Sequence, residues 1–232
     1  MVGDRSPPPA KARVSQSEAA ALYDRLAGVY DLWGHLTESR ARDRALELAD
    51  IRPGQHVLEV AVGTGLAFVQ VARKNPEGRN VGIDISSGML AKAKRRLEQA
   101  GLTHYELSVG SALAIAEEDH SFDVLLNNYM FDLLAEPDWT QAITEFRRVL
   151  KPDGKLVLAN MTTGEATGSR IYERLYRLSP SLMGGCRGVR LSQTLARNGF
   201  SVHSREYVQQ MLFPSEVILA SADGESVPVF DI

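Results

Sequence analysis

The stretch Val57-Leu58-Glu59-Val60-Ala61-Val62-Gly63-Thr64-Gly65 decides the fold of this chain. An apolar run reaches an acid and passes at once into a glycine-containing turn. About twenty residues later, a second apolar run at residues 81–84 also ends in an acid, Asp84. This pairing is typical of α/β sheets that bind a nucleoside-bearing cofactor, because glycines let the backbone approach the ligand and the second acid can accept hydrogen bonds from ribose. The sequence therefore predicts an adenosine-type cofactor.

The residues around the turn favour one cofactor over another. A dinucleotide fingerprint, G-x-G-x-x-G/A, ends in a small residue that lets helix and strand pack closely, whereas Phe68 stands at that position here. Glu59 precedes the turn, and an anion there suits a ligand end with positive charge better than a pyrophosphate. S-adenosylmethionine (SAM) has an ammonium group at that end and no phosphate, so SAM is the cofactor we expect. The alternative is a glycine turn that only connects a strand to a helix.

Strand-like and helix-like segments alternate along the middle of the chain. Strands are expected at residues 56–60, 80–84, 105–109, 122–127 and 155–160, and helices at residues 65–74, 86–100 and 138–150. This order predicts a mostly parallel sheet with helices on both faces. Two further strand patterns, at residues 201–209 and 211–220, predict a terminal antiparallel strand pair. The predicted fold class is therefore α/β, a Rossmann-like, doubly wound and mostly parallel seven-stranded sheet.

Helical patterns also flank the alternating segment. Residues 17–30 and 37–50 repeat apolar side chains near the helical period, and Thr37 is the expected cap of the second helix. Tyr23 and Tyr30 share one face of the first helix. We expect these N-terminal helices to form a lid over the cofactor; packing of both tyrosines in the core is the alternative. Further helices are expected at residues 168–179 and 190–198.

Length and composition limit the class of protein. The 232 residues, 44% of them apolar, suit one domain over residues 15–220, between a disordered tail at 1–14 and a loose tail at 221–232. A net charge of −3 provides no general attraction for nucleic acid. The single cysteine, Cys186, leaves no zinc-type cysteine cluster, and no metal is expected. Because no apolar run is long enough to span a membrane and the first residues lack a signal-peptide pattern, we expect a cytoplasmic protein.

Several segments resemble those of a known family. Residues 59–65, with Ala61 where many relatives have glycine, resemble the first motif of the class I SAM-dependent methyltransferases. Residues 84–90 resemble its ribose-binding segment, and residues 148–155 resemble a helix-turn-strand segment. From residue 23 to about residue 220, the chain is most similar to the branch of ubiquinone/menaquinone C-methyltransferases and bacterial phospholipid N-methyltransferases. It departs from that branch at Ser111, where an acid is common, and at Asn160, where the quinone enzymes usually have glutamate.

The resemblance and the strand ends together give the expected site. The expected cofactor-binding residues are Tyr23, Glu59, Ala61, Gly63, Thr64, Gly65, Asp84, Ile85, Met89, Ser111, Ala112 and Asn127. In this set Glu59 would contact the ammonium group and Asp84 the ribose, and Ile85 and Met89 would enclose the adenine, with core packing as the alternative for Met89. The expected catalytic residues are His35 and Tyr30. The expected substrate-binding residues are Trp33, Asn128, Tyr172, Tyr176, Arg187 and Arg190.

The resemblance implies transfer of a methyl group from SAM to a small or lipid-like acceptor, such as a quinol precursor, a phospholipid head group or an aromatic small molecule. The sulfonium is already an activated leaving group, so the protein must mainly align the reactants. A base is needed only if the acceptor must lose a proton. A transient membrane contact is compatible with a lipid-like acceptor, and the oligomeric state stays open. Two alternatives remain at this point, a non-catalytic SAM-binding regulatory protein and, disfavoured by Phe68, an NAD-type oxidoreductase.

Overall fold

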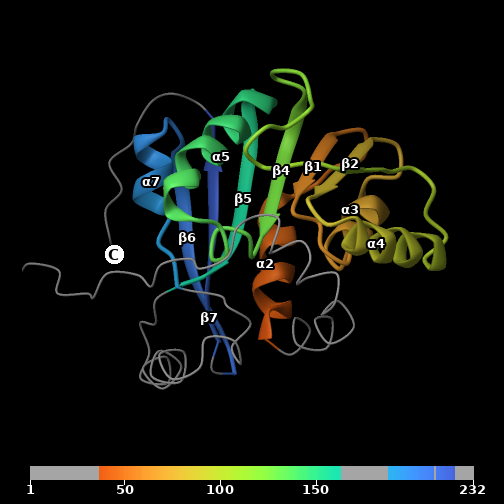
Figure 1. Ribbon diagram of the computed structural model, residues 1–232, viewed down its shortest axis with the longest axis horizontal. Coiled ribbons are helices and arrows are strands. Elements are labelled where there is room, and N and C mark those ends of the chain that lie inside the picture. Colours follow the sequence, from red (N-terminus) through yellow and green to blue (C-terminus); the bar gives the residue numbers. More distant parts are fainter. Residues whose placement is uncertain (1–36, 163–187, 212, 223–232) are drawn as a thin grey trace, which may run out of the picture.

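A seven-stranded sheet organises the molecule (Figure 1). The structure, a computed structural model, describes residues 37–162, 188–211 and 213–222. The strands lie in the order β3-β2-β1-β4-β5-β7-β6. Their bounds are β1 (His56–Val60), β2 (Arg79–Asp84), β3 (Glu106–Val109), β4 (Phe122–Asn128), β5 (Leu150–Met161), β6 (Ser201–Gln210) and β7 (Phe213–Ser221). Strands β1 to β5 are parallel, whereas β7 is antiparallel to both β5 and β6, which confirms the predicted fold class.

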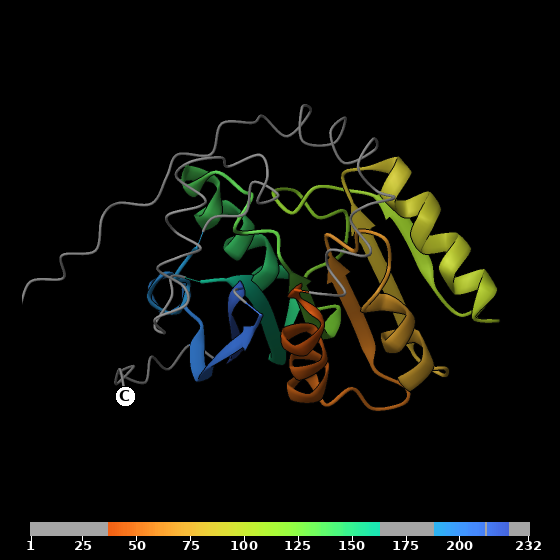
Figure 2. The same cartoon turned by 90° about the horizontal axis from the view of Figure 1, so that it is seen from below.

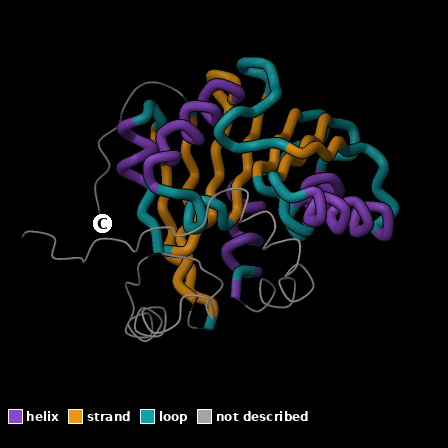
Figure 3. The backbone as a smooth tube through the Cα atoms, in the orientation of Figure 1, coloured by secondary structure: helices purple, strands orange, loops and turns teal. Residues whose placement is uncertain are grey.

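Helices cover both faces of the sheet (Figures 2 and 3). Their bounds are α2 (Ser39–Ala49), α3 (Phe68–Lys74), α4 (Ser87–Gln99), α5 (Glu136–Val149) and α7 (Ser192–Arg197). Apolar side chains of α5 and α7 form one buried core with the sheet, and those of α2, α3 and α4 form a second core on the other face. Burial on both faces explains why the central strands are continuous apolar runs.

The sequence predicted most element bounds to within two residues, and two differences have a clear physical cause. The helix expected from residue 65 begins only at Phe68, because residues 63–67 form turns, and the Gly63 N–H at their start donates to Asp84 at the end of β2. Strand β5 begins at Leu150, because that residue pairs with Phe122 before an irregularity in the β4–β5 register. The predicted cap at Thr37 is wrong, since Glu38 occupies the N-cap position of α2 and makes no side-chain cap hydrogen bond.

Helix α2 is fixed to the antiparallel edge of the sheet. Its apolar side packs on the core beside β4, β5 and β7. On its other side, the Arg44 guanidinium donates to both carboxylate oxygens of Glu206 in β6, at 2.7 and 2.8 Å. The Gln210 amide oxygen accepts from the Arg40 backbone N–H at 2.7 Å. Helix α2 is therefore part of the packed domain, and of the expected lid only this second helix is described.

Other expected segments lie outside the described residues. These are the tail at 1–14, the helices at 17–30 and 168–179, and the last ten residues, while the expected loose tail begins at Ser221, which ends β7. No described helix combines the length and apolar character that a membrane span requires.

Candidate active site

A cavity of about 280 Å³ opens at the carboxyl ends of β1, β2 and β4. Connections from β1 and β4 run in opposite directions along the sheet there, and open α/β sheets bind ligands at such a point. Eight of the twelve expected cofactor residues line it: Glu59, Ala61, Gly63, Thr64, Asp84, Ile85, Met89 and Ala112. The expected substrate residue Asn128 lines it as well. The two acids on which the prediction rested thus lie in one pocket.

The glycine turn lies against the end of β2. The Val62 N–H donates to the Ile83 carbonyl at 3.0 Å, and the Gly63 N–H donates to Asp84 Oδ2 at 2.8 Å. Gly63 has a φ of +57°, and a Cβ added to it would meet no atom within 4 Å. Gly65 has a φ of +79°, and a Cβ there would lie 2.9 Å from the Cβ of Ala93 in α4. Gly63 therefore leaves room at the cavity, whereas Gly65 permits close packing of the turn on α4.

Asp84 is held by the backbone on both sides. Its Oδ2 accepts from Gly63, and its Oδ1 accepts from the Ser86 N–H at 2.9 Å. The Ser86 hydroxyl in turn accepts from the Met89 N–H at 3.0 Å and caps α4. Each carboxylate oxygen can accept more than one hydrogen bond. Asp84 is consequently a rigid acceptor at the cavity wall, the arrangement that a ribose diol requires.

Glu59 is almost completely buried, with 2% of its surface exposed. Burial raises the pKa of its carboxyl to about 8; the Asn128 amide and the Arg42 guanidinium oppose the rise, and the charge of Asp84 adds to it. Among the described residues, its Oε2 has no hydrogen-bond partner, and neither amide atom of Asn128 makes a hydrogen bond of normal geometry. Leaving a buried carboxylate oxygen unpaired is costly. A cationic ligand group beside Glu59 would remove that cost, so this end of the cavity fits an ammonium group.

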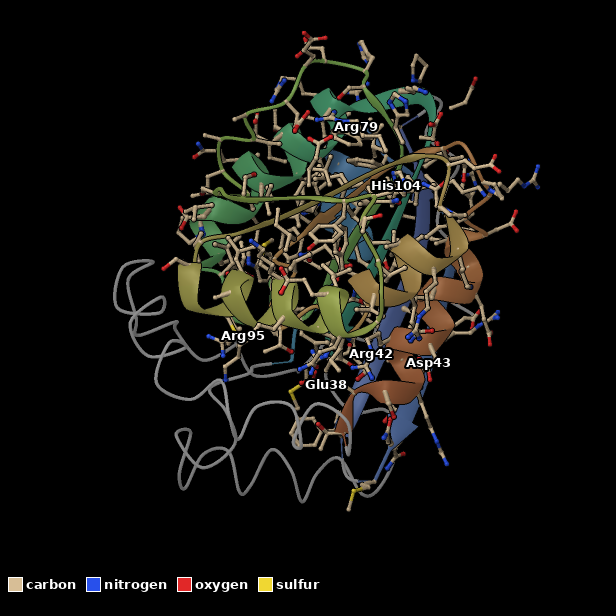
Figure 4. The ribbon with its side chains drawn as sticks, turned by 90° about the vertical axis from the view of Figure 1, so that its right-hand side faces the viewer. Glu38, Arg42, Asp43, Arg79, Arg95 and His104 are labelled. Carbon is tan, nitrogen blue, oxygen red and sulfur yellow. The ribbon has the colours of Figure 1, made fainter. Side chains whose placement is uncertain are left out.

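Sequence reasoning missed a second polar group at the N-terminal end of α2. Glu38 and Arg42, which are 6% and 8% exposed, both line the cavity (Figure 4). Burial raises the pKa of Glu38 to about 8, the charge of Asp132 adds to the rise, and Arg42 opposes it. The Arg42 Nε makes no hydrogen bond. The four-residue spacing of an acid and an arginine was the available signal, but that spacing is common on exposed helices.

The segment after β4 was also missed. Tyr129 has a φ of +54°, which is uncommon for a bulky residue, and its hydroxyl lies 2.8 Å from Ser215 Oγ. Burial raises its pKa well above the usual value, and the charges of Glu38 and Asp132 add to that rise. Tyr129 therefore stays neutral at the cavity wall. Beyond it the wall carries four apolar residues, Met130, Leu133, Leu134 and Ala135, and the acid Asp138.

Four expected site residues are described but do not line the cavity. The fully buried Asn127 donates its amide to the Val60 carbonyl at 2.8 Å, so it ties β4 to β1. Ser111 lies between two lining residues and accepts from the Leu113 N–H at 3.2 Å. Gly65 contacts α4, and Arg190 is exposed. The expected residues outside the described part of the chain are Tyr23, Tyr30, Trp33, His35, Tyr172, Tyr176 and Arg187.

The chemistry of the described lining fits SAM. An orphaned carboxylate oxygen suits the ammonium group, a rigid carboxylate suits the ribose, and the open space at Gly63 admits the ligand. Arg42 is the one basic side chain among the described lining residues, so a pyrophosphate would face mainly acids. No group of three metal-ligating side chains occurs within the described residues.

Known proteins are similar to this chain in sequence and in fold. Residues 57–154 match the family described as "Methyltransferase domain". The chain is 29% identical over 160 residues to a demethylmenaquinone methyltransferase of Bacillus cytotoxicus, a match that covers 67% of each protein. It is 30% identical over 157 residues to the Listeria welshimeri protein of the same name, covering 67% of this chain and 64% of that protein. The chain thus spans about two thirds of the length of these relatives.

Solved structures extend the likeness of the fold. The [4+2]-cyclase SpnF superimposes with a TM-score of 0.73 at 19% identity, over 93% of this chain and 98% of that one. A geranyl diphosphate C-methyltransferase from Streptomyces coelicolor A3(2), solved with Mg²⁺, geranyl diphosphate and S-adenosyl-L-homocysteine, gives a TM-score of 0.63 at 14% identity, over 80% and 79%. One neighbour is named a cyclase and the other a methyltransferase, so the fold alone does not determine the reaction.

Proposed function

Because the chain belongs to the class I SAM-dependent methyltransferases, we propose that it transfers a methyl group from SAM to a small acceptor with an apolar ring or chain. A quinol precursor is the first candidate. The observation that carries the proposal is Glu59, a buried carboxylate with an unpaired oxygen in the same cavity as Asp84. The relatives named demethylmenaquinone methyltransferases support a quinol-type acceptor.

The order of the strands suggests how the reactants lie. Asp84 ends β2 and would accept from the ribose, with Ile85 and Met89 beside the adenine. Glu59 is in β1 and would bind the ammonium group. Since β4 adjoins β1 on the side away from β2, the acceptor would lie over the end of β4.

The apolar wall after β4 supports an apolar acceptor body. Met130, Leu133 and Leu134 line the cavity there, and Asn128 offers an amide with no hydrogen bond of normal geometry. SAM supplies a methyl group on a positively charged sulfur. The residues of this chain need to hold the acceptor atom in line with that methyl group and to exclude water. Free amino acids fit this wall poorly, because they would leave the apolar surface unfilled.

The test is a transfer assay with labelled SAM against separate pools of quinols, phenols, phospholipids and amino acids. Label in the quinol or phenol pool is the expected result. Label in the amino-acid pool alone would overturn the acceptor class and keep the enzyme class. Binding of S-adenosylhomocysteine without transfer to any pool would instead favour a non-catalytic SAM-binding protein.

A further inference from the structure

A buried charged group lies on the acceptor side of the cavity, apart from the pair Glu59 and Asp84. Glu38 and Arg42 come from the N-terminal end of α2, and Tyr129 and Asp132 come from the segment after β4. All four are at most 8% exposed. Segments far apart in sequence thus bring two acids, one cation and one phenol together where the acceptor would lie.

We propose that Glu38 is the base that takes the proton of the methyl acceptor. The proposal rests on the proposed methyl transfer and adds a residue with a defined role to it. The acceptor would carry a weakly acidic hydroxyl group on its apolar body.

The geometry supports an occupant at Glu38. Its carboxylate lines the cavity and makes no hydrogen bond or ion pair with any residue in the described ranges. Two further polar atoms on the same cavity, Arg42 Nε and Glu59 Oε2, have no partner within the part of the chain that the structure describes, although both residues are more than nine-tenths buried. A structural charge cluster would be expected to satisfy these atoms internally. A ligand with a polar group at this place would satisfy them instead.

The proton transfer balances without any further reactant. The Glu38 carboxylate accepts the hydroxyl proton of the acceptor as the acceptor atom bonds to the methyl carbon. The bond between that carbon and sulfur breaks, the sulfur keeps the electron pair, and S-adenosylhomocysteine and the methylated acceptor leave. The proton on Glu38 then passes to water. Arg42 lies on the same cavity wall, where its positive charge stabilises the anion that develops on the acceptor.

The charges that face Glu38 set the direction of its pH dependence. Burial and the charge of Asp132 raise its pKa to about 8, against the opposing charge of Arg42. Tyr129 is neutral in this range, because its own pKa is raised well above the usual value. Glu38 is thus mainly protonated below pH 8 in the empty cavity, and its basic form appears above it. The rate should therefore rise with pH through about 8 and level off above it, and a base with a pKa near the working pH is efficient.

The experiment measures methyl transfer from labelled SAM to naphthohydroquinone under anaerobic conditions, between acid and alkaline pH. Glu38→Gln should lower kcat by roughly 10²–10⁴-fold, the usual contribution of a general base, and should abolish the rise with pH. Binding of S-adenosylhomocysteine should be unchanged. The variant should fold, because glutamine mimics the neutral carboxyl that the empty cavity already favours. Asp43→Asn, on the exposed side of the same helix, is the matched control and should behave like the parent protein.

A second variant separates catalysis from structure. Asp132→Asn removes a charge that raises the pKa of Glu38, so the rise in rate should move to lower pH while the activity at high pH is retained. A merely structural role would lower activity at every pH. Full activity in Glu38→Gln with an unchanged pH profile would overturn the inference and leave the proposed function intact. If the parent protein binds S-adenosylhomocysteine but does not methylate naphthohydroquinone, the quinol acceptor fails and this inference fails with it.

Discussion

The two halves of the cavity are built differently. At the glycine turn and β2, the protein satisfies its own carboxylate: Asp84 accepts from two backbone N–H groups, those of Gly63 and Ser86. Glu59 in β1 is the exception in this half, because its Oε2 has no hydrogen-bond partner among the described residues. At β4 and α2, the Nε of Arg42 and the side-chain amide of Asn128 have no hydrogen-bond partner of normal geometry among the described residues. Apart from Glu59, the first half is complete before any ligand arrives, whereas the second half is completed by what binds there. A preorganised half suits a constant cofactor, and an unsatisfied half suits the molecule that distinguishes one enzyme of the class from another.

The largest effect is expected from removing the carboxylate of Asp84, which the backbone holds in place. Asp84→Ala should weaken binding of S-adenosylhomocysteine at least about a hundredfold, since two charge-assisted hydrogen bonds at ~1.5–3 kcal/mol each are at stake. Because Asp84 also accepts from Gly63, the amide of that glycine should exchange its hydrogen faster in the variant. Calorimetry and hydrogen exchange measure the two effects, with Asp43→Ala on the exposed side of α2 as the control. Unchanged affinity in a folded Asp84→Ala protein would show that this half does not contact the ribose.

A smaller effect is expected from Glu59→Gln. Binding of S-adenosylhomocysteine should be about tenfold weaker, because one charge-assisted hydrogen bond is lost. Burial raises the pKa of Glu59 to about 8 in the empty cavity, and a bound ammonium group favours the ionised form. Binding near pH 7 should therefore release protons, and affinity should rise with pH up to about 8. Calorimetry in buffers of different ionisation enthalpy measures this release. The Gln variant should release fewer protons than the parent; equal release in both would assign the protons to another group.

Substitutions of Gly63 and Gly65 should separate ligand binding from stability within the cofactor half. Gly65→Ala places a Cβ 2.9 Å from the Cβ of Ala93, so overpacking of about 1–3 kcal/mol adds to the strain of a left-handed backbone. In Gly63→Ala the added Cβ would meet no atom within 4 Å. Only the strain of the left-handed backbone remains there, about 1–2 kcal/mol. Denaturant unfolding should show the larger loss of stability for Gly65→Ala. Calorimetry should show weaker ligand binding for Gly63→Ala, and the opposite pattern would reverse the roles assigned to these residues.

The smallest effect is expected from Asn128→Ala, on the acceptor side of Glu59. A neutral hydrogen bond is worth about 0.5–1.5 kcal/mol, so KM for the acceptor should rise only a few-fold. Steady-state kinetics with naphthohydroquinone measure it. Asn127→Ala is the informative partner, because the Asn127 amide donates to the Val60 carbonyl and its loss should reduce stability. A change in cofactor affinity without a change in KM would place Asn128 in the cofactor half.

The same contrast explains what the sequence could predict. Glu59 and Asp84 were found because each ends a strand in a contiguous motif whose geometry the backbone sets. Asn127 was expected in the cavity and lies outside its lining, since successive side chains of a strand point to opposite faces and the sequence does not say which face is the site. Glu38 and Arg42 were missed because their role appears only when α2 packs beside β4. The start of α3 was misplaced for a related reason, as the turn before it is bonded to β2.

The anchoring of α2 to β6 has a consequence for how such enzymes diverge. The Arg44–Glu206 pair and the bond to Gln210 hold the helix at the edge of the sheet opposite the glycine turn. These anchoring contacts do not involve the side chains at positions 38 and 42, which line the cavity. On the proposed function, substitutions at the N-terminal end of α2 would alter the acceptor side of the cavity and leave the contacts that hold the helix in place. Descendants of one ancestral protein would then differ most at the end of a helix that is itself firmly held.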